Sequence, residues 1–136
     1  MSAIDDILLS FDQLDPVDRL EWLIEFGNSL PELPNALHEE RDAGRYIVHE
    51  CQAPVFLKAE VIEGNLHLYA DAPREAAIAK GFISVLISMF DKMPTITLQE
   101  GPADMLQALK IYDLVGMQRK RGLSAIYASL RAQVLN

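Results

Sequence analysis

The chain has 136 residues and a mass of 15.2 kDa, and we expect residues 1–136 to form a single domain. Half of its residues are hydrophobic and 24% are charged, which excludes a disordered chain. Its formal charge of −8 argues against a nucleic-acid-binding module that neutralises many phosphates. Its single cysteine, Cys51, excludes an internal disulfide and a zinc site built on two cysteines.

The charges are unevenly distributed along the chain. The first 40 residues contain ten acidic side chains and one basic side chain, whereas residues 110–136 contain five basic and one acidic. Such asymmetry can steer a protein partner, although a solvated acidic surface is the simpler interpretation. The N-terminus lacks the basic region of a secretory signal, and the most apolar stretch, 81–90, is well short of the ~20 residues that a membrane span requires. We therefore expect a cytoplasmic protein that does not enter a membrane.

The first predicted helix begins at Asp15-Pro16, where Asp15 can cap the helix and Pro16 fits its first position. The helix is expected to end near residues 28–30, before a proline. Its predicted apolar face consists of Val17, Leu20, Leu23 and Ile24. A charged connector over 39–45 and a short apolar segment over 46–48 follow.

A β-hairpin is predicted next. Apolar side chains alternate with the others over 55–62 and again over 66–70, which is the periodicity of strands. The residues between them, Glu63-Gly64-Asn65, are typical of a tight turn. The two strands are therefore expected to pair in antiparallel fashion.

The remaining elements are predicted to be helical. The stretch 73–90 is nearly apolar all round, with one polar stripe of Lys80, Ser84 and Ser88, so it belongs in the middle of the fold. A connector over 91–101, a short helix over 102–109 and a last amphipathic helix with an apolar face over 123–134 complete the chain. The predicted fold class is α+β, a small antiparallel sheet covered by helices.

Cys51 lies between two strand-like segments, and Pro54 interrupts the strand pairing beside it. Polar neighbours, His49, Glu50 and Gln52, surround the cysteine, which indicates a loop rather than an apolar core position. A reactive thiol and an inert buried cysteine are therefore both open interpretations. Glu50 would raise the pKa of the thiol, whereas a protonated His49 or a distant arginine would lower it.

The same residues allow other functions. A metal site at His49, Glu50 and Cys51 is disfavoured because neighbours in an extended segment point to opposite faces. A Cys–His hydrolase would require His67, which is more simply an exposed strand residue. The basic run that opens the last helix at Arg119 is typical of solvated surface. A thiol enzyme, a thiol-based redox sensor and a non-catalytic interaction domain remain alternatives.

Four ordered motifs resemble those of the SufE family, whose members accept sulfur from cysteine desulfurases. The family pattern Leu-Gly-x-x-Leu-Pro-x-Leu corresponds to residues 26–33, and Val-x-Gly-Cys-Gln-Ser-x-Val-Trp corresponds to residues 48–56. The Ala-Asp-Ser-(acid)-Ala-x-Ile-x-Lys-Gly-Leu motif is similar to 70–82, with a short insertion near Pro73. The family's Ser-Arg-x-Asn-Gly-Leu aligns with 118–123. Departures from the pattern are Glu50, Ala53, Phe56 and Arg121, which stand where the family has Gly, Ser, Trp and Asn.

The resemblance implies a SufE/IscU-like domain and a role for Cys51 as sulfur acceptor. Arg119, Gln52 and Glu50 would then be supporting or partner-binding residues. The implied partners are a cysteine desulfurase, SufS-like or CsdA-like, and an iron–sulfur cluster scaffold complex. By the same resemblance the chain would be an accessory protein rather than an enzyme and would carry no cofactor, since the pyridoxal phosphate belongs to the desulfurase.

Overall fold

A computed structural model describes residues 2–135. In chain order these residues form α1 (Ala3–Gln13), α2 (Pro16–Gly27), a short 3₁₀ turn (Asn35–Leu37), α3 (His38–Asp42), β1 (Ile47–Val48), β2 (Val55–Ile62), β3 (Asn65–Asp71), α4 (Ala77–Phe90), α5 (Thr95–Gln99), α6 (Met105–Ala108) and α7 (Met117–Leu135). Helices and one small sheet together confirm the α+β prediction.

The sheet has the order β1-β2-β3 and is antiparallel throughout. The predicted hairpin is confirmed, with Phe56 opposite Asp71 at one end and Ile62 opposite Asn65 at the other. Its two-residue turn consists of Glu63 and Gly64, whose φ angles are 51° and 83°. Two positive φ angles are what the turn of a right-twisted two-residue hairpin requires, and glycine adopts them without steric cost.

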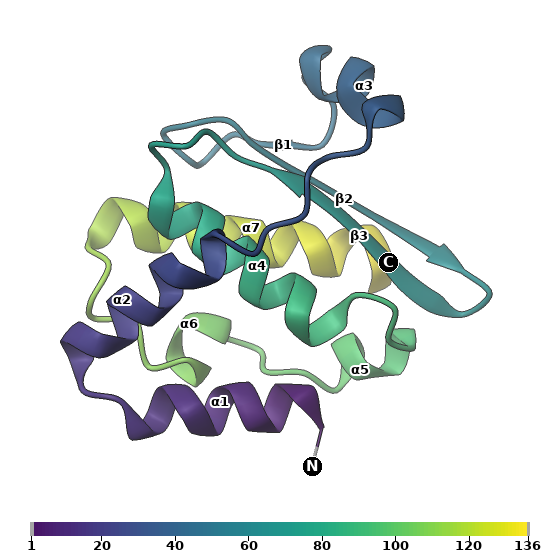
Figure 1. Ribbon diagram of the computed structural model, residues 1–136. Helices are drawn as coiled ribbons and strands as arrows, with labels where there is room; N and C mark the ends of the chain where they lie inside the picture. The colour runs from purple at the N-terminus through teal and green to yellow at the C-terminus, as the bar shows by residue number, and fades with distance from the viewer. Residues whose placement is uncertain (1, 136) are drawn as a thin grey trace.

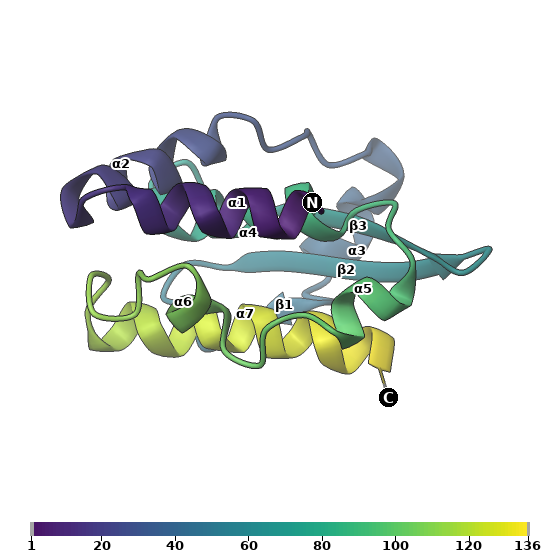
Figure 2. The ribbon, with the colours of Figure 1, turned by 90° about the horizontal axis from the view of Figure 1, so that it is seen from below.

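Two helices, α4 and α7, pack against the sheet. In Figure 1, α4 and α7 lie between the sheet above them and α1 and α6 below them. Viewed from below in Figure 2, α4 lies next to α2 and α1, and α7 runs along the opposite side of the molecule beside α6. The predicted position of the apolar helix in the middle of the fold is confirmed, because most of its side chains between Phe82 and Phe90 are buried.

A close crossing of two helices positions α4. A methyl group at Gly81 of α4 would lie 2.0 Å from the carbonyl oxygen of Leu23 in α2, and one at Gly27 would lie 3.2 Å from the backbone nitrogen of Gly81. Only glycine allows the two backbones to approach this closely. The crossing therefore depends on the absence of a side chain at position 81.

The N-terminal helix α1 is an element that the sequence analysis does not predict. Its apolar residues recur at helical spacing, and Ser2 caps it by accepting a hydrogen bond from the Asp5 amide at 3.2 Å. Phe11, which is fully buried, packs on the Trp22 ring with a centroid distance of 4.6 Å and on the Phe26 ring at 6.3 Å. The helix thus closes the core beneath α2 and α4.

Several finer predictions are wrong. The helix α3 overlaps the connector over 39–45, and α5 lies within the connector over 91–101. Contacts with distant residues stabilise these single turns: ion pairs join α3 to the sheet, and α5 buries Leu98. Val17 and Ile24 of the predicted apolar face are 69% and 41% exposed. Ser84 of the predicted polar stripe is only 3% exposed, and its hydroxyl is satisfied by donating to the Lys80 carbonyl at 2.9 Å.

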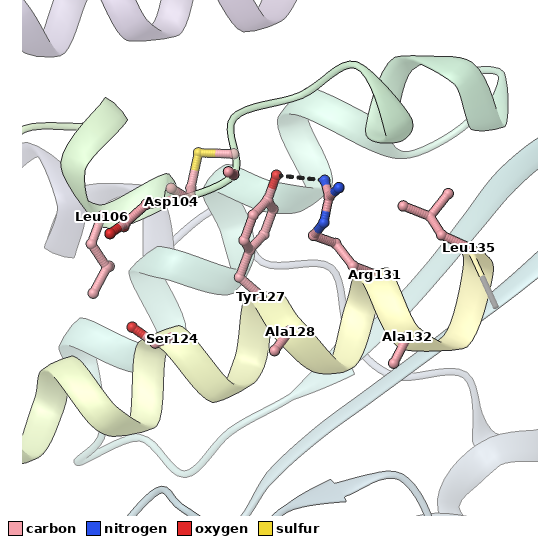
Figure 3. Close-up of a pocket in the computed structure, with 10 residues that line it drawn as sticks. Asp104, Leu106, Ser124, Tyr127, Ala128, Arg131, Ala132 and Leu135 are labelled. Atoms are coloured by element: carbon pink, nitrogen blue, oxygen red, sulfur yellow. Dashed lines mark hydrogen bonds between the residues drawn. The ribbon is translucent and has the colours of Figure 1, made fainter.

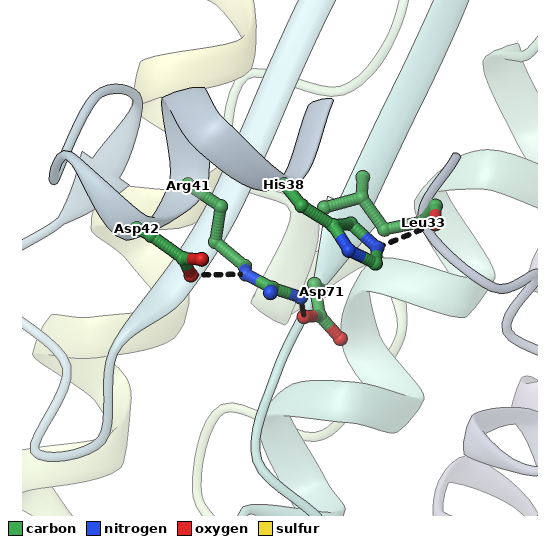
Figure 4. Close-up of polar contacts among 5 residues, drawn as sticks. All are labelled: Leu33, His38, Arg41, Asp42 and Asp71. Carbon is green, nitrogen blue, oxygen red and sulfur yellow. Dashed lines mark hydrogen bonds and ion pairs between the residues drawn. The ribbon is translucent and has the colours of Figure 1, made fainter. Parts of the chain in front are cut away.

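Side-chain hydrogen bonds connect the helices to the sheet. Figure 4 shows Arg41 of α3 between Asp42 and Asp71, with an Arg41–Asp71 distance of 2.8 Å that joins α3 to the end of β3. The side-chain amide of Gln133 on α7 accepts from the Ala59 amide at 2.8 Å and donates to the Leu57 carbonyl at 2.9 Å. It thus pairs with β2 where β1 has ended. None of the helices within 2–135 is long and apolar enough to cross a membrane.

Candidate functional site around Cys51

Cys51 lies in the loop 49–54 between β1 and β2, as predicted. Outside the strand pairing, one backbone hydrogen bond holds this loop in the described part of the chain: the Cys51 amide donates to the Val48 carbonyl at 3.4 Å. That distance is long for an N–H···O bond. The loop is therefore held mainly by packing.

The thiol packs against the last helix. Cys51 is half-buried, and a methyl group at Gly122 of α7 would lie 3.1 Å from its Sγ and 3.4 Å from its Cα. The loop and the helix thus touch at a position without a side chain. The expected loop location is correct, and α7 partly shields the sulfur.

Two causes act in the same direction on the thiol. Burial raises the pKa of Cys51, and the neighbouring carboxylate of Glu50 raises it further. Both favour the neutral thiol over the thiolate, which is the nucleophilic form. The free protein therefore holds Cys51 predominantly protonated at neutral pH.

The thiol opens onto a pocket of about 410 Å³ where four parts of the chain meet. Its lining comes from α2, from the cysteine loop, from the start of α4 and from the start of α7: Ile24, Cys51, Gln52, Ala53, Glu75, Ala76, Ala77, Ile78, Ala79, Gln118, Arg119, Gly122 and Leu123. Small apolar side chains from the start of α4 line the pocket together with the thiol, and the polar lining residues supply one positive charge, at Arg119, and one negative charge, at Glu75. A small group without net charge fits such a site.

The structure brings three of the four predicted site residues into this pocket. Cys51, Gln52 and Arg119 all line it, although Arg119 is 68 positions away in the sequence. Glu50 is exposed and does not line the pocket; it acts on the thiol through its charge. These placements describe geometry, and the roles of the four residues remain predictions.

Two histidines outside the cysteine loop do not line the thiol pocket. His67 is on β3 opposite Glu60, several residues from the end of the hairpin that adjoins the cysteine loop, and it does not line the pocket. The His38 ring nitrogen Nε2 bonds the Leu33 carbonyl at 3.0 Å (Figure 4). Among residues 2–135, no three His, Cys, Asp or Glu side chains converge as a metal site would require.

A larger pocket of about 580 Å³ lies between α6 and α7. Figure 3 shows Tyr127 and Arg131 directed toward the loop that precedes α6. The Tyr127 hydroxyl donates to the Pro102 carbonyl at 2.6 Å, and the Arg131 guanidinium donates to the Leu98 carbonyl at 2.9 Å. These groups hold a loop in place, so the smaller pocket with the thiol is the better candidate site.

Two contributors to the thiol pocket are not identified from the sequence. Gly122 falls inside the last of the four motifs, close to Arg119, so its position is visible there but its contact with Cys51 is not. Glu75 follows the predicted hairpin at the start of a helix, where an acid is ordinary. It corresponds to the acidic position of the third family motif, but that motif does not show that it lies beside the thiol.

Comparisons with known proteins agree with this architecture. Residues 5–134 match the SufE family model, described as an Fe-S metabolism associated domain. Two uncharacterized SufE-like proteins of Mycobacterium tuberculosis, from two different strains, are each 32% identical to this chain over 134 residues, which is 98% of this chain and 92% of theirs.

Two further similarities differ in coverage. Chloroplastic quinolinate synthase of Arabidopsis thaliana is 30% identical over 108 residues, which is 79% of this chain but 14% of that protein. The solution structure of a hypothetical protein from Thermus thermophilus matches with a TM-score of 0.81 and 29% identity, covering 99% of this chain and 96% of the other. The fold is therefore shared over nearly the whole chain.

Proposed function

The chain belongs to the SufE family, which places it in Fe-S metabolism, and on this premise we propose that it accepts a sulfur atom on Cys51 from a cysteine desulfurase. The observation that carries the proposal is the placement of Cys51. Its thiol lies in a loosely held loop and opens onto a pocket lined by Arg119. Both residues belong to motifs through which the chain resembles the family.

The reaction is a thiol–persulfide exchange. The Cys51 thiolate attacks the terminal sulfur of a persulfide on the donor cysteine, and a new S–S bond forms at Cys51. The S–S bond of the donor breaks, and the donor cysteine leaves as a thiolate, which takes up the proton that Cys51 has lost. One sulfur atom moves without net oxidation, so a single cysteine is sufficient.

The residues around the thiol would have different roles in this exchange. Arg119 carries a positive charge at the pocket that holds the thiol, where it would stabilise the anionic persulfide that forms. Gln52 lines the same pocket beside the sulfur and would contact the donor protein. Glu50 is exposed outside the pocket and would meet the donor surface.

In the second half of the proposal, Cys51 passes its sulfur to an iron–sulfur cluster scaffold complex. The persulfide on Cys51 is then the donor, and the same exchange runs toward an acceptor thiol. The chain supplies no cofactor chemistry in either step, because the pyridoxal phosphate acts in the desulfurase. Stimulation of the desulfurase follows if removal of the persulfide limits its turnover.

The raised thiol pKa favours this function over a peroxide sensor. A redox-sensing cysteine is a low-pKa, accessible thiol, whereas burial and the Glu50 carboxylate raise the pKa of Cys51. A thiol that is protected at rest and becomes reactive when a donor docks suits a sulfur carrier, because it avoids reaction with other electrophiles.

Intact-mass measurement tests the proposal. The protein is incubated with a cysteine desulfurase and cysteine in the absence of reductant, and we expect a gain of one sulfur atom that reductant reverses. A Cys51→Ser variant is the matched control and should gain none. Absence of the gain with the desulfurases tested, or an equal gain on Cys51→Ser, would contradict the proposal.

A further inference from the structure

Gly122 is the residue of α7 that faces the Cys51 side chain. A methyl group there would lie 3.1 Å from Sγ, 3.4 Å from Cα and 3.7 Å from Cβ of Cys51. The distance to Sγ is tighter than an ordinary van der Waals contact, whereas the distances to Cα and Cβ are ordinary contacts. A side chain at position 122 would thus press on the sulfur of Cys51.

The helix does not need a glycine at this position for its own conformation. Gly122 is buried in the interior of α7 and is not among the glycines with positive φ, so alanine would be the better helix former there. The adjoining Leu123 and Ile126 are buried and anchor the helix in the core. The close approach of the cysteine loop is therefore the feature that requires glycine.

We propose that Gly122 is the positioning residue that seats the Cys51 thiol in its shielded state. With no side chain at position 122, the sulfur packs against α7; a methyl group there would push the sulfur away from α7 by a few tenths of an ångström. The loop would move rather than the helix, because one long backbone hydrogen bond holds the loop whereas buried side chains hold α7. The role deepens the proposed function and rests on it, since it specifies how the resting thiol is kept from reacting before a donor arrives.

Displacement of the thiol has a chemical consequence. Burial is the largest cause of the raised pKa of Cys51, and Glu50 is the smaller one. The charged residues that line the pocket are Glu75 before α4 and Arg119 on α7, and the lining residue from α2, Ile24, is uncharged. Glu50 on the loop lies outside the pocket and acts through its charge. A less buried thiol therefore ionises at lower pH while its charged neighbours stay the same.

The test measures alkylation of Cys51 by iodoacetamide as a function of pH, without any desulfurase. The thiolate displaces iodide, forming a C–S bond as the C–I bond breaks, so the rate reports thiolate fraction and access. For Gly122→Ala we expect several-fold faster alkylation at neutral pH and a lower midpoint. The thiolate fraction rises about tenfold for each unit by which the pKa falls, and the lower nucleophilicity of the less basic thiolate offsets part of this gain in rate. Ser124→Ala, an exposed position on the same helix, is the control and should leave the profile unchanged.

A folded Gly122→Ala protein with the alkylation rate and pH midpoint of the wild type would overturn the proposal. If Gly122→Ala does not fold, the Cys51→Ala/Gly122→Ala double variant decides, because it removes the sulfur that the new methyl group meets. Folding of the double variant supports the proposed positioning of Cys51 by Gly122. Its failure to fold would show that Gly122 serves helix packing instead. Because no donor protein is used, a negative result here is distinct from a failure of sulfur transfer.

Discussion

Two features of its surroundings favour the protonated form of the Cys51 thiol. Partial burial against Gly122 and the carboxylate of Glu50 both raise the thiol pKa, although the proposed reaction requires the thiolate. A glutamate stands at the position where the family motif has glycine, so this chain adds a charge that the motif does not contain. The reactivity of the resting protein is therefore governed by two features, the contact with α7 and the neighbouring carboxylate.

Replacement of Glu50 by glutamine separates the charge from the burial. Glu50→Gln removes the carboxylate, so the pH midpoint of Cys51 alkylation should fall and the rate at neutral pH should rise. The change should be smaller than for Gly122→Ala, because burial is the larger cause. Glu63→Gln, in the turn at the far end of β2, is the matched control. If the alkylation profiles of Glu50→Gln and Glu63→Gln coincide, the carboxylate of Glu50 does not raise the thiol pKa.

At the scale of the elements, the crossing of α2 and α4 determines where the thiol pocket lies. The start of α4 provides one wall of the pocket, and α2 contributes Ile24. The distance between these helices depends on Gly81, whose missing side chain leaves room for the Leu23 carbonyl. The glycine that follows Lys80 in the third motif is therefore a packing residue that supports the site indirectly.

Gly81→Ala should destabilise the protein strongly. A methyl group 2.0 Å from a backbone oxygen forces the helices apart, and overpacking of this kind costs about 1–3 kcal/mol or more. Denaturant unfolding should show a lower midpoint than the wild type. Ser88→Ala, at an exposed position of the same helix, is the control and should unfold at a denaturant midpoint close to that of the wild type. If the midpoint of Gly81→Ala equals that of the wild type, the two helices can move apart without loss of stability and the prediction is wrong.

At the scale of the whole molecule, two groups with raised pKa values make the free energy of unfolding depend on pH in the alkaline range. Burial raises the pKa of both the Cys51 thiol and the Tyr127 phenol. A group whose pKa is higher in the folded state contributes stability that is fully present below its unfolded pKa and is lost as the pH rises through the folded value. The unfolded values are about 8.5 for cysteine and about 10 for tyrosine.

The free energy of unfolding should therefore decline in two stages, the first above about pH 8.5 and the second above about pH 10. The first stage belongs to Cys51 and should be absent in Cys51→Ala; the second belongs to Tyr127 and should be absent in Tyr127→Phe. Urea unfolding across this pH range measures both. If the two variants lose stability in parallel with the wild type, general charge repulsion in this acidic chain is the cause instead.

The elements with strong periodicity are predictable from the sequence because their patterns are local. The hairpin over 55–70, its turn at Gly64 and the apolar helix ending at Phe90 follow from alternation, turn chemistry and composition. The short helices α3 and α5 have few residues and weak patterns, so their contacts with distant residues decide them, ion pairs to the sheet for α3 and burial of Leu98 for α5. Periodicity assigns Ile24 to a buried face, but α2 lies so that this side chain lines the pocket.

Local sequence is enough to establish that the chain has one thiol, that it lies in a polar loop between two strands, and that a family motif surrounds it. What the sulfur touches depends instead on the packing of the folded chain. Gly122 and Arg119 are far from Cys51 in sequence, and they reach its surroundings because α7 packs against the sheet. Residue types in a loop are a local property, whereas the burial that raises the thiol pKa arises where distant segments meet.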